Sequence, residues 1–173
     1  MKKTYYFAYG SNLYAPQIEQ RCPDSEYIKN VRLDGWLFRI SPKHGGANIV
    51  QTNNNEDHVW GALYTLSDND IETLNLYEGI DDNEYTQIHI DIEGIDEKTL
   101  TYVVPDCSGH DRAYKDYHER ILAGLKQRGI CNLYIGKFEE QKPKQENHPS
   151  HDYTGNAIGK KKVRRPKSPD KRR

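Results

Sequence analysis

Short runs of apolar and aromatic residues, separated by turns rich in glycine and asparagine, recur along most of the chain. Residues 4–8 are aromatic and β-branched, which is typical of a strand. Residues 31–41 predict a longer strand, whose apolar alternation changes phase across Asp34-Gly35 and so indicates a bulge or bend. Similar patterns predict strands over residues 47–51, 59–66, 85–92 and 99–104.

Three segments have the spacing and end signals of helices. A short helix is expected over residues 14–21. A second should begin after Ser67, which is a good N-cap, and stop at Gly79. A third is expected over residues 111–128, where an apolar stripe recurs at helical spacing.

Strands mixed with a few helices, without strict alternation of the two, predict a mixed α/β (α+β) fold. The expected architecture is a small mixed β-barrel flanked by helices, formed by residues 1–158. Residues 159–173 lack apolar periodicity and are expected to form a disordered tail. The length of 173 residues suits one domain with a substantial core plus such a tail.

The charge distribution separates the same two regions. The net charge is −1, yet residues 160–173 carry nine Lys or Arg against Asp170 alone, or +8. The other 16 basic and 25 acidic residues leave the body at −9. The tail therefore suggests either a nuclear-import address, a weak contact with nucleic acid or another anion, or a solvated end.

No apolar run approaches the length of a membrane span, and the N-terminus leads into a strand instead of a signal peptide. A cytoplasmic location and no membrane partner are expected. The cysteines Cys22, Cys107 and Cys131 show no CxxC pairing, and the seven histidines show no metal-ligand spacing. No metal and no cofactor is expected.

The first strand runs straight into Gly10-Ser11-Asn12. Glycine combines easy access to positive φ with a bare backbone, so main-chain N–H groups can approach a ligand closely at Gly10. Successive N–H groups and the short polar side chains could hold a carboxylate or an oxyanion. A tight turn that merely follows a strand is the alternative interpretation.

Several motifs in the same order resemble the γ-glutamylcyclotransferase family, over roughly residues 4–156. They are Tyr6-Phe7-Ala8-Tyr9-Gly10-Ser11-Asn12-Leu13, Val59-Trp60-Gly61, Tyr77-Glu78-Gly79 followed by Tyr85, Tyr117 with Gly124 and Gly129, and Asp152-Tyr153-Thr154-Gly155. The resemblance implies a small barrel flanked by helices and a glutamate that transfers protons beside the glycine loop. It also implies that a γ-glutamyl amino acid or dipeptide is converted to 5-oxoproline and a free amino acid.

The resemblance assigns roles to particular residues. Glu78 is the candidate general base and acid, and its place at a helix end beside an apolar wall predicts a raised pKa. The candidate substrate-binding residues are Tyr6, Phe7, Ala8, Tyr9, Gly10, Ser11, Asn12, Tyr85 and Tyr117. Because the nucleophile would be the substrate's own amine, the reaction needs no serine or cysteine nucleophile.

Two departures from the family pattern stand out. Asn83 stands where the family usually has glycine, and residues 106–110 replace a proline-rich approach to Tyr117. Asparagine tolerates positive φ, so the first turn should survive. Cyclotransferases acting on glutathione or γ-glutamylamines remain alternatives, as does a non-catalytic binding module that uses its basic tail. A homodimer is also left open.

Overall fold

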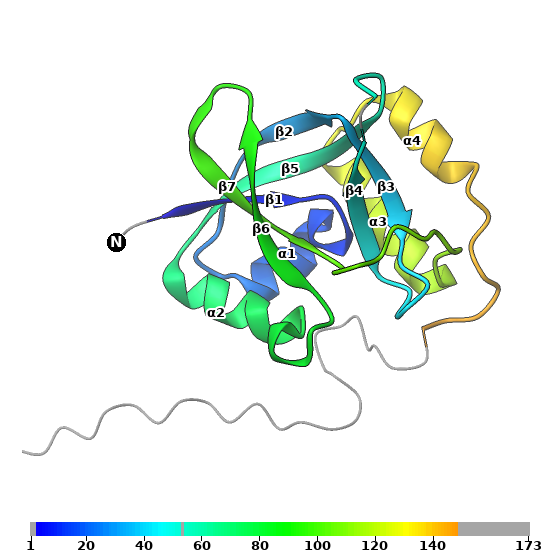
Figure 1. Cartoon of the computed structure of the whole chain (residues 1–173), viewed down its shortest axis with the longest axis horizontal. Coiled ribbons are helices and arrows are strands. Elements are labelled where there is room, and N and C mark those ends of the chain that lie inside the picture. The colour runs from blue at the N-terminus through cyan, green and yellow to red at the C-terminus, as the bar shows by residue number, and fades with distance from the viewer. Residues whose placement is uncertain (1–2, 53, 149–173) are drawn as a thin grey trace, which may run out of the picture.

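A central five-stranded sheet organises the protein (Figure 1). The computed structural model describes residues 3–52 and 54–148. In the sheet order β2-β5-β1-β7-β6, the central strand β1 pairs antiparallel with β5 and parallel with β7. The strands span Thr4–Ala8 (β1), Glu26–Asp34 (β2), His58–Leu66 (β5), Thr86–Ile92 (β6) and Ile95–Val103 (β7). A separate two-stranded sheet joins Trp36–Ile40 (β3) and Ala47–Gln51 (β4).

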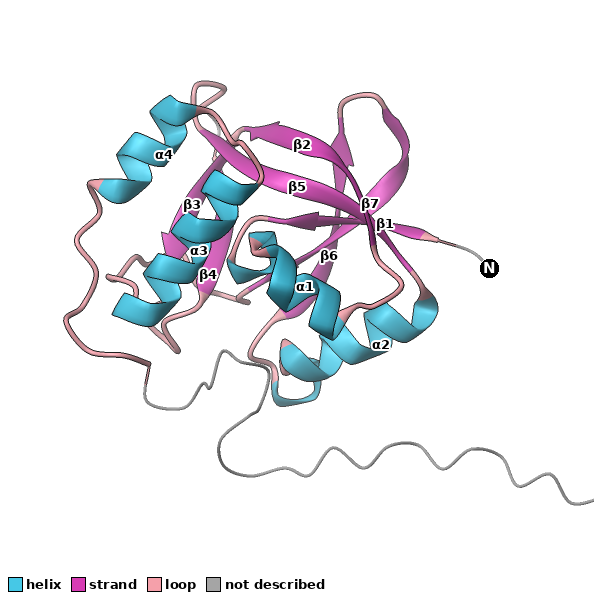
Figure 2. Cartoon of the chain, turned by 180° about the vertical axis from the view of Figure 1, so that it is seen from behind, coloured by secondary structure: helices cyan, strands magenta, loops and turns pink. Residues whose placement is uncertain are grey.

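The helices gather on one side of the central sheet, which Figure 2 shows from behind. They span Ala15–Arg21 (α1), Asp68–Tyr77 (α2), Lys115–Gln127 (α3) and Asn132–Glu139 (α4). A short 3₁₀ turn, Ser11–Leu13 (η1), connects β1 to α1, and a second, Ile80–Asp82 (η2), follows α2. Within the described residues, no helix has both the length and the apolar character needed to cross a membrane.

The mixed α+β class is confirmed, and the small β-barrel that was expected does not close. In the described residues β2 and β6 are the two open edges of the sheet, and β3 and β4 pair only with each other. The expected strand over residues 31–41 is divided at Gly35, whose φ of +77° turns the chain out of the sheet. Its first half belongs to β2 and its second half to β3, so the phase change marks a passage between two sheets.

The helix signals agree with the structure in most places. The Ser67 hydroxyl accepts a hydrogen bond from the Asp70 N–H at 3.1 Å, and the Asp70 carboxylate accepts one from the Ser67 N–H at 3.1 Å. This reciprocal cap starts α2 where expected. Helix α3 starts at Lys115 instead of residue 111, because Tyr114 has an extended backbone and the Asp111 N–H bonds to the Ile40 carbonyl. Helix α4 was not predicted.

Two glycines of the helices lie in opposite surroundings. A Cβ on Gly124 of α3 would lie 2.7 Å from the Leu13 Cβ and 2.7 Å from the Tyr14 nitrogen, so the helix packs tightly against the chain around η1. A Cβ on Gly136 of α4 would meet nothing within 4 Å. Gly124 therefore sets how closely α3 approaches the chain that leads from β1 into α1.

Gly124→Ala is expected to lower the free energy of unfolding by about 1–3 kcal/mol, because overpacking against backbone outweighs the better helix propensity of alanine. Gly136→Ala is the matched control, and it should raise that free energy by about 0.5–1 kcal/mol. Urea unfolding followed by circular dichroism measures both. Equal effects of the two changes would show that α3 can shift away from η1 at no cost.

Candidate active site

A cavity of about 130 Å³ opens beyond the end of β1. Its walls come from β1 and the loop after it, the last residue of α1, the end of α2, the β3–β4 hairpin, the segment before β6, β7, α3 and the described C-terminal segment. Segments far apart in the sequence therefore meet at one point. Tyrosine hydroxyls, a largely buried carboxylate and two histidine side chains supply polar groups to this wall.

The glycine loop forms one wall of the cavity. Ser11 and Asn12 are buried there, at the start of η1. Gly10 has a φ of −108°, so the expectation that this glycine adopts a positive φ is wrong. The reason for glycine is close packing instead, since a Cβ at this position would lie 2.9 Å from the Ala47 Cβ and 3.3 Å from the Tyr117 hydroxyl.

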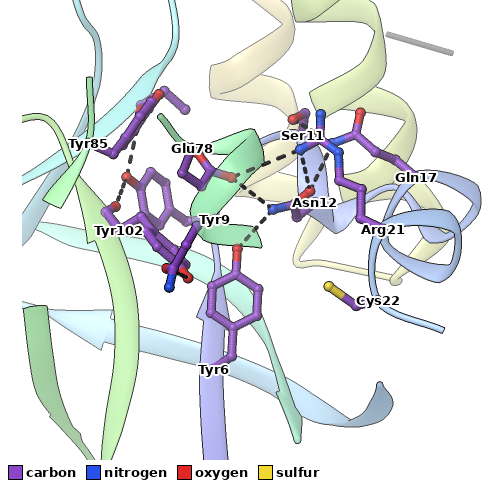
Figure 3. A network of polar contacts seen from close by, with 12 residues as sticks. Tyr6, Tyr9, Ser11, Asn12, Gln17, Arg21, Cys22, Glu78, Tyr85 and Tyr102 are labelled. Atoms are coloured by element: carbon purple, nitrogen blue, oxygen red, sulfur yellow. Dashed lines mark hydrogen bonds and ion pairs between the residues drawn. The ribbon is translucent and has the colours of Figure 1, made fainter. Parts of the chain in front are cut away.

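Glu78 faces this loop from the C-terminal end of α2 (Figure 3). Its side chain is only 15% exposed, and its Oε1 accepts a hydrogen bond from Asn12 Nδ2 at 3.3 Å. Gly79 follows with a φ of +61°, which ends the helix where the sequence predicts. Burial raises the pKa of Glu78, while the charge of Arg21 and the hydrogen bond from Asn12 act in the opposite direction. The expected direction of the pKa shift is confirmed.

Asn12 is the centre of a polar network that joins α1 to Glu78 (Figure 3). Its Oδ1 accepts hydrogen bonds from Gln17 Nε2 at 2.9 Å and Arg21 Nη1 at 3.0 Å. Its Nδ2 also donates to the Tyr6 hydroxyl at 3.0 Å. Gln17 and Arg21 were not predicted as site residues. Their spacing of four residues, directly after the glycine loop, is the signal that places both on the same helix face.

The other tyrosines predicted for the site make hydrogen bonds to the main chain through their hydroxyls. The Tyr9 hydroxyl donates to the Tyr102 carbonyl at 2.5 Å. Tyr85 and Tyr117 both bind the main chain of Ala47, Tyr85 donating to its carbonyl at 2.8 Å and Tyr117 accepting from its N–H at 3.0 Å. Burial raises the pKa of Tyr6, Tyr9 and Tyr117, so these hydroxyls keep their protons at neutral pH.

Phe7 and Ala8 are not brought into the cavity. Their side chains are 0% and 1% exposed, and they belong to the hydrophobic core. Opposite them in the sheet stand Leu63 and Ala62 of β5. Both residues therefore have a packing role, and the structure gives no support to their predicted substrate contacts.

The two departures from the family pattern have different consequences. Asn83 has a φ of +54°, so it takes the conformation for which the family uses glycine, as expected. Residues 106–110 pack on the β3–β4 hairpin, where Asn48 Nδ2 donates to the Cys107 carbonyl at 2.8 Å and His110 Nδ1 accepts from the Ile40 N–H at 3.0 Å. This segment contributes no side chain to the cavity.

The cavity has no cysteine in its wall. Cys22 is buried in the core, and burial raises its pKa to about 12, so it stays a thiol. Within residues 3–52 and 54–148, no three His, Cys, Asp or Glu side chains are grouped so that they could hold a metal ion. The predicted motif Asp152-Tyr153-Thr154-Gly155 and the basic tail lie outside the described residues.

The arrangement suits proton transfer next to a bound polar group. A carboxylate with a raised pKa can accept a proton near neutral pH and return it later. The glycine loop and the protonated tyrosines supply hydrogen-bond donors around it. Because Glu78 lies within hydrogen-bond reach of the loop residue Asn12, the proton acceptor and the hydrogen-bond donors face the same part of the cavity.

The curated relatives described below are named after the same activity. A mouse (Mus musculus) γ-glutamylcyclotransferase is 29% identical over 149 residues, covering 80% of this chain and 78% of the relative. The human (Homo sapiens) γ-glutamylcyclotransferase is 27% identical over 161 residues, covering 87% and 81%. A solved γ-glutamyl cyclotransferase structure superposes with a TM-score of 0.74 at 24% identity, covering 90% of this chain and 94% of the other, which shows a common fold.

The sequence profile of one family, described as "Gamma-glutamyl cyclotransferase, AIG2-like", matches residues 6–121. This range includes the glycine loop, Glu78, Tyr85 and Tyr117. The chain therefore belongs to the γ-glutamyl cyclotransferase, AIG2-like family of enzymes.

Proposed function

We propose that this enzyme converts a γ-glutamyl amino acid or dipeptide into 5-oxoproline and the free amino acid or peptide. The observation that carries the proposal is the contact between the Glu78 carboxylate and the glycine loop through Asn12, at one wall of the cavity. A base and a set of donors are thereby held around a volume suited to a small polar substrate. Family membership supports the same reaction class.

The proposed reaction occurs within the substrate. The α-ammonium group loses one proton to Glu78, and the resulting amine attacks the γ-carbonyl carbon, which closes a five-membered ring. The bond from that carbon to the departing nitrogen then breaks as Glu78 returns its proton to that nitrogen, and the ring nitrogen gives up its second proton to the released amine. The protein mainly holds the substrate in a ring-closing conformation, which is catalysis by positioning.

The donors around the cavity have two tasks in this scheme. One is to bind the substrate's α-carboxylate, and the other is to stabilise the oxyanion that develops on the γ-carbonyl oxygen. Main-chain N–H groups of the Gly10 to Asn12 loop and the hydroxyls of Tyr6 and Tyr117 are the candidates for both. The Tyr85 hydroxyl, which donates to the Ala47 carbonyl, is a candidate to accept a hydrogen bond from the substrate. Raised pKa values keep Tyr6 and Tyr117 as neutral donors.

The resemblance of Tyr9-Gly10-Ser11-Asn12-Leu13 to the motif of the γ-glutamylcyclotransferases favours free γ-glutamyl amino acids or dipeptides over glutathione and γ-glutamylamines. Incubation with γ-glutamyl-alanine, glutathione and γ-glutamyl-lysine, with 5-oxoproline measured by chromatography, tests this order. γ-Glutamyl-alanine should turn over fastest. Faster release from glutathione would reassign the substrate, and no 5-oxoproline from any of them would contradict the proposed reaction.

We also propose that the basic tail is separate from the chemistry, because Glu78 and the glycine loop lie far back in the chain. A chain ending at Gly159 should keep its turnover of γ-glutamyl dipeptides, and any retention on immobilised RNA or DNA at low salt should vanish. Loss of turnover, with an unchanged circular dichroism spectrum, would show that the tail takes part in the active site.

A further inference from the structure

We propose that Arg21 is a positioning residue for the reaction, because its guanidinium fixes the direction of the Asn12 side-chain amide and so makes Asn12 a hydrogen-bond donor to Glu78. The inference rests on the function proposed above and adds a residue to it. Arg21 ends α1, and Glu78 follows α2, so the two residues belong to different helices (Figure 3).

The chemistry of the three side chains determines the direction of the amide. An arginine can only donate hydrogen bonds, and an ionised glutamate can only accept them. Asn12 lies between the two, with Oδ1 at 3.0 Å from Arg21 Nη1 and Nδ2 at 3.3 Å from Glu78 Oε1. A reversed amide would place an N–H₂ group against the guanidinium and an oxygen against the carboxylate.

Gln17 does not determine this direction by itself. Its side-chain amide has a donor and an acceptor, so it can pair with either orientation of Asn12. It donates to Asn12 Oδ1 at 2.9 Å and to the Ser11 hydroxyl at 2.8 Å. Its Oε1 is buried and makes no hydrogen bond within the described part of the chain. Among the protein partners of the Asn12 amide, Arg21 is the one whose donor role is invariant at any working pH.

The guanidinium is itself held in place between the two helices. Arg21 is only 10% exposed in its side chain, and its Cζ lies 4.5 Å from the centre of the Tyr77 ring. A cation over a ring face is attracted to it, and more strongly when water is excluded. Because Tyr77 directly precedes Glu78, the stacking ties the arginine to the end of α2 that carries the carboxylate.

Arg21 does not bind Glu78 by a direct hydrogen bond. The distance between Nη1 and Oε1 is 3.9 Å, which is too long for a hydrogen bond but close enough for attraction between the charges. The arginine therefore acts in two ways: through Asn12, which it orients, and through its positive charge, which favours the ionised carboxylate.

Both effects change the pKa of Glu78, and so the pH at which its carboxyl group ionises. Burial and the nearby Glu84 raise the pKa of Glu78, while Arg21 and Asn12 lower it. The other titratable groups with an electrostatic influence on this carboxylate are Tyr6, Tyr9, Tyr102, Tyr117 and Cys22. Burial raises the pKa of each, so they are neutral near pH 7. His44 and His148 also face the cavity, from the β3–β4 hairpin and the described C-terminal segment, and burial lowers the pKa of His44. Arg21 is the cation that lowers the pKa of Glu78.

The test compares Arg21→Met, which removes the charge and the donors, with Arg21→Lys, which keeps a charge and a pure donor. Without the arginine the pKa of Glu78 rises, so the ionised base forms only at higher pH. The acidic limb of the kcat/KM profile for γ-glutamyl-alanine should therefore move to higher pH in Arg21→Met and remain near its wild-type position in Arg21→Lys. The kcat of Arg21→Met should fall about tenfold, with a smaller change in KM.

A double-mutant cycle with Asn12→Ala tests the route through the amide. If Arg21 acts mainly by orienting Asn12, adding Arg21→Met to Asn12→Ala should lower kcat by far less than it does in the wild type. Full additivity of the two losses would overturn the orienting role. Arg32→Gln is the control, since Arg32 on β2 pairs with Asp34 at 2.8 Å and is not part of the cavity wall. Its acidic limb should stay in place.

A second measurement reads the role of Arg21 without any substrate. The ¹³Cδ resonance of Glu78, assigned by its loss in Glu78→Gln, should titrate at a higher pH in Arg21→Met than in the wild type. An unchanged titration would refute the inference even if the enzyme turns over. If no γ-glutamyl compound is a substrate, the proposed function fails while this titration still decides the role of Arg21.

Discussion

Glu78→Gln should abolish nearly all 5-oxoproline formation while leaving substrate binding measurable. The amide keeps the size of the carboxylate. Its oxygen can still accept a hydrogen bond from Asn12 Nδ2, which lies 3.3 Å from Oε1 of Glu78 in the wild-type protein. It cannot accept a proton from the substrate's ammonium group, so kcat should fall by about 10²–10⁴-fold. Steady-state kinetics gives kcat, and calorimetric titration with γ-glutamyl-alanine gives the affinity.

The matched control is Glu72→Gln, which makes the same change on the exposed side of α2. Its kcat should remain near the wild-type value. Near wild-type turnover in Glu78→Gln would instead remove Glu78 from the proton transfers. Asn12→Ala keeps the carboxylate but removes the hydrogen-bond donor to it, so its kcat should lie between those of Glu72→Gln and Glu78→Gln.

Glu78→Gln should not destabilise the fold at neutral pH. Burial raises the pKa of Glu78 in the folded protein, so the unfolded chain gives up this proton at lower pH. Ionisation therefore costs stability as the pH rises from the unfolded pKa to the folded pKa, and the neutral glutamine avoids this cost. The melting temperature of Glu78→Gln at pH 7 should be equal to or higher than that of the wild type.

Gly10→Val is expected to lower kcat/KM by about 100-fold through displacement of the glycine loop. The new Cβ would lie 2.9 Å from the Ala47 Cβ and 3.3 Å from the Tyr117 hydroxyl, and Ala47 stands at the start of a strand that cannot yield easily. Because Tyr85 and Tyr117 both bind the Ala47 main chain, a shift here also moves two hydroxyls of the cavity wall. Kinetics with γ-glutamyl-alanine measures the loss.

A compensating change distinguishes this mechanism from a general loss of structure. Gly10→Ala places its Cβ against the Ala47 Cβ, and Ala47→Gly removes that atom while leaving the main-chain hydrogen bonds intact. The double variant should therefore recover part of the activity lost in Gly10→Ala. No recovery, with circular dichroism unchanged, would mean that contact with Ala47 is not what excludes side chains at position 10.

Much of the local structure was predictable because local signals cause it. The Ser67 cap, the left-handed Gly79 at the end of α2 and the tolerance of Asn83 for positive φ depend on residues close together in the chain. Candidate Glu78 and its raised pKa were also foreseen, the first from a motif and the second from its place at a helix end near apolar groups. Helix α4 was missed, since its eight residues bury only Ile135 and Phe138.

The misassignments near the site have physical causes. Phe7 and Ala8 belong to a contiguous motif, but β1 is the central strand of the sheet and both side chains are buried in the core, while Tyr6 of the same strand lines the cavity. The motif therefore combines packing residues with binding residues. Gly10 was expected to need a positive φ, whereas its φ is −108° and the limit on its side chain comes from Ala47, which lies 37 positions further along the chain.

By itself, the sequence determined the α+β class and most strands and helices, which depend on periodicity, caps and turn residues that act over a few positions. The glycine loop and Glu78 were predicted as site residues from the resemblance of their motifs to the family. Only the tertiary structure decided that the sheet stays open, that Gln17 and Arg21 reach Asn12, and that Asn12 meets Glu78 across 66 positions. Such contacts arise from the packing of α1 against the end of α2, and no local pattern specifies which side chains that packing brings together.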